Sequence, residues 1–274
     1  LGYNWAPTLA PREVDRIIES TWGKTYSCEH PVMKEYCDER CIFFKRKDMV
    51  VPVMSSTTLE QQYVNFIRTD FSGSSFNLRN VFTGFDSHRV LPGEMVVVWG
   101  DTGVGKSTFV HNLAVRLSPM AVLWGSFENH ATLHYRRGIQ IANGMTEGEV
   151  DSHYLQHVNS LSSSVAHIDT LFAAPQVSQL PKIVALHNPR VFVVDTLDGL
   201  HDPTTSDENV RIGRIAIALK ELATSLNIIV VVVHHISKGQ TVDFKGNRRR
   251  LTLHSGKGSS SVEQKADQVW AIEE

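Results

Sequence analysis

The residues best suited to chemistry form a glycine-rich run that ends in a lysine and hydroxyl side chains. The run has the pattern G-x-x-x-x-G-K-S and, with the residue after it, comprises Gly100, Asp101, Thr102, Gly103, Val104, Gly105, Lys106, Ser107 and Thr108. Such glycines let successive backbone N–H groups turn inward around a polyphosphate, and the N-terminus of a following helix adds positive potential. Lys106 would reach the β- and γ-phosphates, and Ser107 would offer its hydroxyl to Mg²⁺. The run predicts a nucleoside triphosphate site with Mg²⁺ as cofactor.

Two acidic residues at the ends of apolar runs are candidates for the rest of this chemistry. Asp195 ends the run Val191–Val194, the place of the carboxylate that helps to hold magnesium. Thr196 follows it instead of a glutamate, so the base that activates water must come from another strand. Glu128, which ends Trp124–Phe127, is the candidate for that base, and the alternative is a solvated loop carboxylate. The sequence has no Asn-Lys-x-Asp motif for reading guanine, which favours ATP over GTP.

A pair of histidines, His234 and His235, follows the apolar run Ile228–Val233. In open α/β sheets ligands bind at the carboxyl ends of the strands, so His235 is placed to contact the γ-phosphate and report its loss to a neighbouring loop. The alternative is a histidine packed at a strand end. The candidate catalytic residues are therefore Lys106, Glu128, Asp195 and His235.

The elements that must position these residues alternate between short apolar runs and helical patterns. The apolar runs are Glu94–Trp99, Ala121–Trp124, Val191–Val194, Ile228–Val233 and Gln268–Ile272. Continuous apolar runs of this length are typical of strands buried on both faces. One helix begins near Lys106, and another begins at a capping-box pattern formed by Thr205 and Glu208. The apolar stripe of this second helix consists of Ile212, Ile215, Leu219, Leu222 and Leu226. The alternation predicts an α/β fold with a mostly parallel, doubly wound sheet.

Charge and composition narrow the possible partners. The 274 residues contain 27 Lys and Arg against 29 Asp and Glu, a formal net charge of −2, so any nucleic-acid site must be local. Basic residues gather between positions 236 and 265, where aromatic side chains are nearly absent. This pattern indicates contact with the phosphates of single-stranded DNA rather than base stacking, and the alternative is an ordinary solvated loop. The candidate DNA-binding residues are Lys245, Arg248, Arg249, Arg250, Lys257, Gly258 and Ser259.

A cysteine–histidine cluster lies near the start of the chain. Its four potential ligands are Cys28, His30, Cys37 and Cys41, which include every cysteine of the sequence. Four nitrogen and sulfur ligands fit a structural Zn²⁺ site, with an iron–sulfur cluster or unliganded thiols as alternatives. Three cysteines argue against a disulfide framework, and no apolar run suits a membrane span or a signal peptide. We therefore expect a soluble protein of a reducing, intracellular compartment that contacts no membrane.

Taken in order, the motifs of residues 83–274 resemble the RecA-like ATPase core of replicative hexameric DNA helicases of the DnaB and Twinkle type. The motifs that carry the resemblance are the phosphate loop, Thr83–Asp86, Leu91–Glu94, Leu123–Glu128, Val193–Asp195, Val233–His235 and Gly258–Asp267. The resemblance implies a RecA-like P-loop fold, ATP hydrolysis and a homo-hexameric ring. It also implies 5′–3′ unwinding of duplex DNA by translocation on one strand, with residues 248–258 forming or flanking a loop that faces the DNA.

The start of the chain resembles a different module. Residues 7–20 and the cysteine cluster are similar to the tail of phage or plasmid primase modules, which implies a primase or primase-polymerase domain upstream or in trans. The absence of an initiator methionine indicates a fragment of a longer polypeptide. We expect a primase-like tail with a zinc-type module over 1–50 and a linker with a linker helix over 51–80. An ATPase domain over 81–274 would be incomplete at its C-terminus, because the family's arginine finger would lie beyond Glu274.

Three other functions are compatible with the phosphate loop. A RecA/RadA-type recombination or repair ATPase would form filaments without unwinding forks. A non-unwinding DNA clamp or loader component would use ATP only to assemble. A P-loop kinase is disfavoured by the basic Ser/Gly-rich stretch and by the lack of an evident lid.

Overall fold

The computed structural model describes residues 54–68, 73–235 and 259–273, and the chain divides into two units, Leu1–Thr69 and Asp70–Glu274. In the first unit the structure describes one helix, α4 (Ser56–Arg68), none of whose residues is buried. This helix was predicted from the spacing of Leu59, Tyr63, Phe66 and Ile67, and it begins three residues before the first of them. The primase-like tail and the cysteine–histidine cluster lie outside the described residues.

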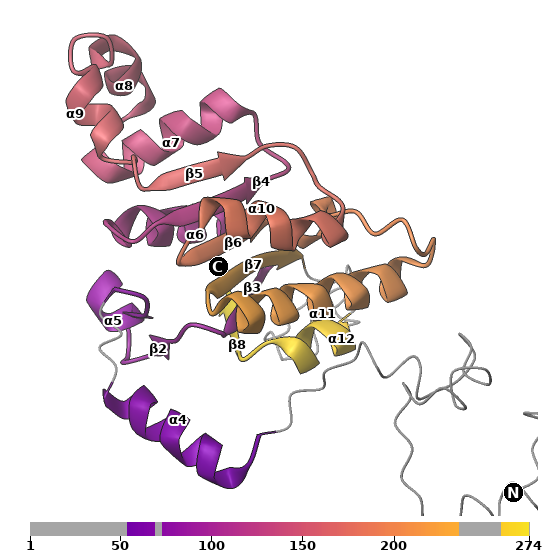
Figure 1. Ribbon diagram of the computed structural model, residues 1–274. Helices are drawn as coiled ribbons and strands as arrows, with labels where there is room; N and C mark the ends of the chain where they lie inside the picture. Colours follow the sequence, from indigo (N-terminus) through magenta and orange to yellow (C-terminus); the bar gives the residue numbers. More distant parts are fainter. Residues whose placement is uncertain (1–53, 69–72, 236–258, 274) are drawn as a thin grey trace, which may run out of the picture. The chain divides into compact units, whose positions relative to one another are not determined.

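The second unit is built on a six-stranded parallel sheet with the order β5-β4-β6-β7-β3-β8 (Figure 1). The strands are β3 (Met95–Gly100), β4 (Val122–Ser126), β5 (Ile168–Leu171), β6 (Val191–Asp195), β7 (Ile229–His235) and β8 (Gln268–Ile272). The sheet confirms the predicted α/β fold and the five predicted apolar strands. The edge strand β5 was not predicted, because its residues alternate in polarity and are only partly buried.

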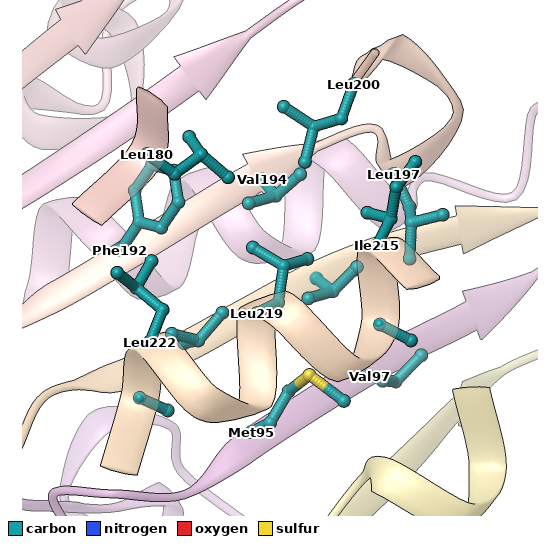
Figure 2. Close-up of a cluster of buried hydrophobic side chains, with 14 of the residues drawn as sticks. Met95, Val97, Leu180, Phe192, Val194, Leu197, Leu200, Ile215, Leu219 and Leu222 are labelled. Carbon is teal, nitrogen blue, oxygen red and sulfur yellow. The ribbon is translucent and has the colours of Figure 1, made fainter. Parts of the chain in front are cut away.

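Both faces of this sheet are covered, which explains why its central strands are continuous apolar runs. In β3, Met95, Val97 and Trp99 pack into one core, whereas Val96 and Val98 pack into another on the opposite face. The first core is completed by α10 (Leu180–His187), α11 (Glu208–Leu226) and α12 (Ser259–Lys265), and Figure 2 shows part of it. The second core is completed by α6 (Lys106–Arg116) together with α5 (Leu78–Val81) and β1 (Phe76–Asn77).

The remaining elements lie around this sheet. A two-stranded antiparallel sheet joins β1 to β2 (Arg89–Val90). Helices α7 (Ala131–Asn143), α8 (Glu147–His153) and α9 (Val158–Ser163) share a small apolar core of their own. Short 3₁₀ turns occupy Val177–Gln179 and Leu197–Gly199. In the part of the chain that the structure describes, no helix is both long and apolar enough to cross a bilayer.

Two local predictions are wrong. The long helix α11 begins at Glu208 with Asp207 as its N-cap, because the Asp207 side chain accepts a hydrogen bond from the Val210 N–H. Thr205 does not cap this helix. Its hydroxyl accepts a hydrogen bond from the Asp207 N–H instead and forms the turn before the helix. The polar stretch 71–80, expected as a loop, contains β1 and the first turns of α5 in its described part.

Asp267 ties the edge strand β8 to the amino end of β3. One carboxylate oxygen of Asp267 accepts hydrogen bonds from the Met95 N–H and from the Lys220 ammonium, both at 2.7 Å. Lys220 also donates to the carbonyl of Gly93 at 2.8 Å, and the Asp267 N–H donates to the carbonyl of Met95. These contacts lie at the edge of the sheet opposite the phosphate loop. In this structure Asp267 therefore holds β8 in register.

Two buried histidines pack between α6, α7 and β4. The rings of His111 and His134 stack with centroids 4.6 Å apart, and both also contact the indole of Trp124. Burial lowers the pKa of His111 to about 3 and that of His134 to about 4, and the nearby Arg137 charge lowers both further. Gly138 makes room for this stack, because a Cβ there would lie 3.2 Å from Nε2 of His111. Both imidazoles are therefore neutral in the folded protein at neutral pH.

This pair predicts a loss of stability in mild acid. Below pH 6.5 the two histidines bind protons in the unfolded chain only, so their contribution is complete above that pH and falls as the pH drops toward 4. Each one lowers the free energy of unfolding by about 1.4 kcal/mol per pH unit in that window. Urea unfolding at pH 7, 6 and 5 measures this slope. A His111→Leu/His134→Leu variant should lose about twice that slope, and an unchanged slope would contradict the neutral pair.

Candidate active site

The phosphate loop connects β3 to α6 in the way that the sequence predicts. Gly103 and Gly105 have φ angles of +90° and +92°, a left-handed conformation that L side chains rarely adopt, and Gly105 is the N-cap of α6. At Gly100 a Cβ would lie 2.7 Å from the Val104 side chain and 2.8 Å from the carbonyl oxygen of Ile272. The glycines are thus required by the backbone, which leaves the N-terminal N–H groups of an eleven-residue helix facing the loop.

Lys106 lies within this loop. Its side chain is 5% exposed, and its ammonium donates to the carbonyls of Gly100 at 3.0 Å and Asp101 at 2.8 Å. Burial lowers its pKa, and the negative charges of Asp101, Glu128 and Asp195 act in the opposite direction. Both carbonyl acceptors belong to the loop itself, so the ammonium is held where a polyphosphate cradled by the loop would meet it.

Ser107 and Asp195 join the phosphate loop to β6. The Ser107 hydroxyl donates to Oδ1 of Asp195 at 2.8 Å, and the Asp195 side chain is 1% exposed. Burial raises the pKa of Asp195 to about 6, although the Ser107 hydrogen bond lowers it. Its second oxygen, Oδ2, is buried and has no hydrogen-bond partner among the described residues. A hydroxyl and a carboxylate with an unsatisfied oxygen form the kind of oxygen donor set that Mg²⁺ takes, so these residues fit the predicted cation.

Glu128 lies at the same edge of the sheet. Oε1 of Glu128 accepts a 2.9 Å hydrogen bond from the Thr196 hydroxyl, and Nε2 of His235 lies 3.5 Å from the same oxygen. These residues follow or end β4, β6 and β7, which are neighbours in the sheet, and β3 with its phosphate loop is the next strand. The structure therefore brings the four candidate catalytic residues together at the carboxyl ends of four adjacent strands.

Phe127 fixes the position of Glu128 in the chain. The Phe127 ring leaves no room for side chains at its two glycine neighbours, because a Cβ at Gly125 would lie 2.7 Å from it. A Cβ at Gly199 would lie 2.6 Å from Cβ of Phe127. The Phe127 N–H also donates to the carbonyl of Asp195 at 2.9 Å, which joins β4 to β6 at the site. Sequence reasoning missed this arrangement, because Gly199 is far from Phe127 in the chain.

Other predicted site residues lie beyond the reach of the structure. Among the candidate DNA-binding residues, Lys245, Arg248, Arg249, Arg250, Lys257 and Gly258 lie outside the described residues, and Ser259 is described only as the first residue of α12. The predicted zinc ligands also lie outside them. Within the described ranges, no group of three or more metal-ligating side chains is found.

Comparisons with solved structures identify the fold. A solved helicase-type ATPase domain aligns with a TM-score of 0.65 and 18% identity, covering 81% of this chain and 84% of that one. A DnaB-like replicative helicase, in a structure concerned with its interactions with primase, aligns with a TM-score of 0.61 and 18% identity. That match covers 80% of this chain and 56% of the helicase. The parallel sheet with its phosphate loop is thus a RecA-like P-loop ATPase fold.

Comparisons of sequence give the family. The DNA repair protein RadA of Synechocystis sp. is 26% identical over 157 residues, and RadA of Streptococcus pneumoniae is 25% identical over 158 residues. These matches cover 54% and 56% of this chain but only 30% and 32% of the two relatives, so the matched segment spans about a third of their length. Residues 87–241, which include all four candidate catalytic residues, match the AAA_25 family model, described as an AAA domain. The chain therefore belongs to the AAA_25 family of AAA domains.

Proposed function

We propose that this chain is the ATP-driven motor of a replicative DNA helicase, which translocates on single-stranded DNA and separates the duplex. One observation carries the proposal. The phosphate-loop lysine, the Ser107–Asp195 pair and the Glu128–His235 pair meet at the carboxyl ends of four adjacent strands. ATP hydrolysis needs these three components: a phosphate cradle, a cation site and a base near a group that can sense the γ-phosphate.

Each residue has a role that follows from its place. The loop N–H groups and Lys106 bind and orient the phosphates, while Ser107 and Asp195 hold the cation. The bound Mg²⁺ neutralises charge on the phosphates. Glu128 accepts a proton from the attacking water, because its carboxylate is half exposed at the strand ends. His235 contacts that carboxylate and directly precedes the basic stretch 236–258 in the sequence, so loss of the γ-phosphate can be passed to that stretch.

The finer parts of the proposal rest on the family resemblance of the sequence. They are a homo-hexameric ring, 5′–3′ polarity, DNA contact through the predicted basic residues, and a primase or polymerase domain upstream or in trans. The zinc module over 1–50 belongs to this part of the proposal. The likeness to a helicase studied with primase supports looking for such a partner.

The test is ATP-dependent unwinding of a forked DNA duplex with a labelled strand. Forks that carry only a 5′ single-stranded tail should be unwound, and forks that carry only a 3′ tail should not. ATP turnover stimulated by DNA without any unwinding would overturn the helicase proposal. Unwinding from the 3′ tail would overturn the polarity alone.

A second candidate is a recombination or repair ATPase, favoured by the 25–26% identity to RadA proteins over the ATPase segment. This function would give DNA-stimulated ATP turnover together with filaments on single-stranded DNA. Electron microscopy of the protein with DNA and a slowly hydrolysed ATP analogue distinguishes closed rings from filaments. A clamp or loader component would instead show ATP-dependent assembly with little steady-state turnover.

A further inference from the structure

The residue after Asp195 links the two acidic residues of the site. Thr196 directly follows β6, its side chain is 1% exposed, and its Oγ1 donates the 2.9 Å hydrogen bond to Oε1 of Glu128. His235 approaches that same oxygen. Within the described residues, every hydrogen bond and ion pair of the Glu128 carboxylate is made through Oε1. Oε2 is therefore the oxygen left for a water molecule.

A fixed donor matters here because the glutamate is otherwise free to move. The Glu128 side chain is 50% exposed, and a long exposed side chain samples several rotamers in water. The threonine is its opposite: the side chain is buried, β-branched and therefore stiff at χ1. A hydrogen bond from a stiff, buried hydroxyl to one carboxylate oxygen selects one placement of the other oxygen before the substrate binds.

We propose that Thr196 is a positioning residue for ATP hydrolysis, which acts by holding the Glu128 carboxylate through Oε1. This inference rests on the proposed function, because it takes Glu128 as the group that accepts the proton of the attacking water. Thr196 itself gains and loses no proton in the step. Its hydroxyl keeps Oε2 directed at the water while the bond between the γ-phosphorus and ADP breaks.

The hydroxyl can be removed with little change of shape. Thr196→Val replaces the hydroxyl by a methyl group, and we expect kcat for ATP to fall about 10- to 100-fold, because loss of orientation at a reacting group costs factors of this size. The KM for ATP should change less than about twofold, since the phosphate loop is untouched. Thr196→Ser keeps the donor and should restore most of the lost kcat. Thr224→Val, which removes an exposed hydroxyl bonded to the backbone of α11, is the matched control.

The measurements are steady-state ATP turnover of the chain with single-stranded DNA and thermal melting of every variant. A wild-type kcat in Thr196→Val overturns the inference, and so does an equal loss in Thr196→Ser. If Thr196→Val fails to fold, Thr196→Ala is judged by the same two criteria.

Glu128→Gln separates this inference from the proposed function. If wild-type protein shows no turnover, or Glu128→Gln turns over normally, the proposed function fails and the inference fails with it. If Glu128→Gln is inactive and Thr196→Val is not impaired, only the inference fails. Adding Thr196→Val to Glu128→Gln should cause no further loss, because both changes remove the same placed carboxylate.

Discussion

Replacement of Lys106 by alanine is expected to weaken ATP binding about 30- to 1,000-fold, because a buried charged partner of the phosphates is worth roughly 2–4 kcal/mol. The ammonium already lies inside the loop, bonded to two loop carbonyls, so its energetic cost of burial is met in the folded protein. Turnover should be lost along with binding. Titration with a fluorescent ATP analogue at fixed Mg²⁺ gives the affinity directly.

The control for this change is Lys182→Ala. Lys182 is an exposed lysine of α10, a helix that belongs to the other core of the sheet, so this variant removes an equal charge away from the loop. It should bind ATP as the wild type does. Wild-type affinity in Lys106→Ala would show that the loop does not bind nucleotide through this lysine.

Glu128→Gln should separate binding from chemistry. A general base contributes roughly 10²- to 10⁴-fold, and we expect kcat for ATP to fall at least about 100-fold. The amide oxygen of glutamine can still accept the Thr196 hydrogen bond, so the local structure and the ATP affinity should stay within about twofold of wild type. Single-turnover kinetics measure the chemical step, and the fluorescent analogue measures binding.

Glu221→Gln is the matched change, because Glu221 is an exposed carboxylate on α11. Its turnover should equal that of the wild type. If Glu128→Gln lost affinity and turnover together, Glu128 would contribute to binding rather than act as the base. Unimpaired turnover would move the base to another residue.

The parts of the site that the sequence predicts share a local signal. The glycine run determines the shape of its own turn, so the phosphate loop can be recognised from adjacent residues. Apolar runs such as Val191–Val194 indicate strands buried on both faces, and the residue that ends such a strand must lie at the sheet edge. This reasoning placed Asp195, Glu128 and His235 at the carboxyl ends of their strands, and the structure finds them there.

The parts that were missed depend on contacts between distant segments. Thr196 is informative only when β4 and β6 are known to be neighbours, because its partner Glu128 lies on another segment. Strand β5 has mixed polarity because it lies at the edge of the sheet. The start of α11 was misplaced because Thr205 and Asp207 are both good N-cap residues, and only the backbone path decides between them.

The strand order also decides when this protein can acquire its shape during synthesis. Strand β3, which carries the phosphate loop, lies between β7 and β8: Met95 pairs with Val230, and Val96 pairs with Gln268. At roughly 5–20 residues per second, a ribosome needs on the order of ten seconds to make the first of these partners after β3 is complete. Through that interval one of the most apolar strands of the chain has no neighbour. The nascent protein therefore depends on late strands to complete its nucleotide site, and truncation before β7 should leave an aggregation-prone chain.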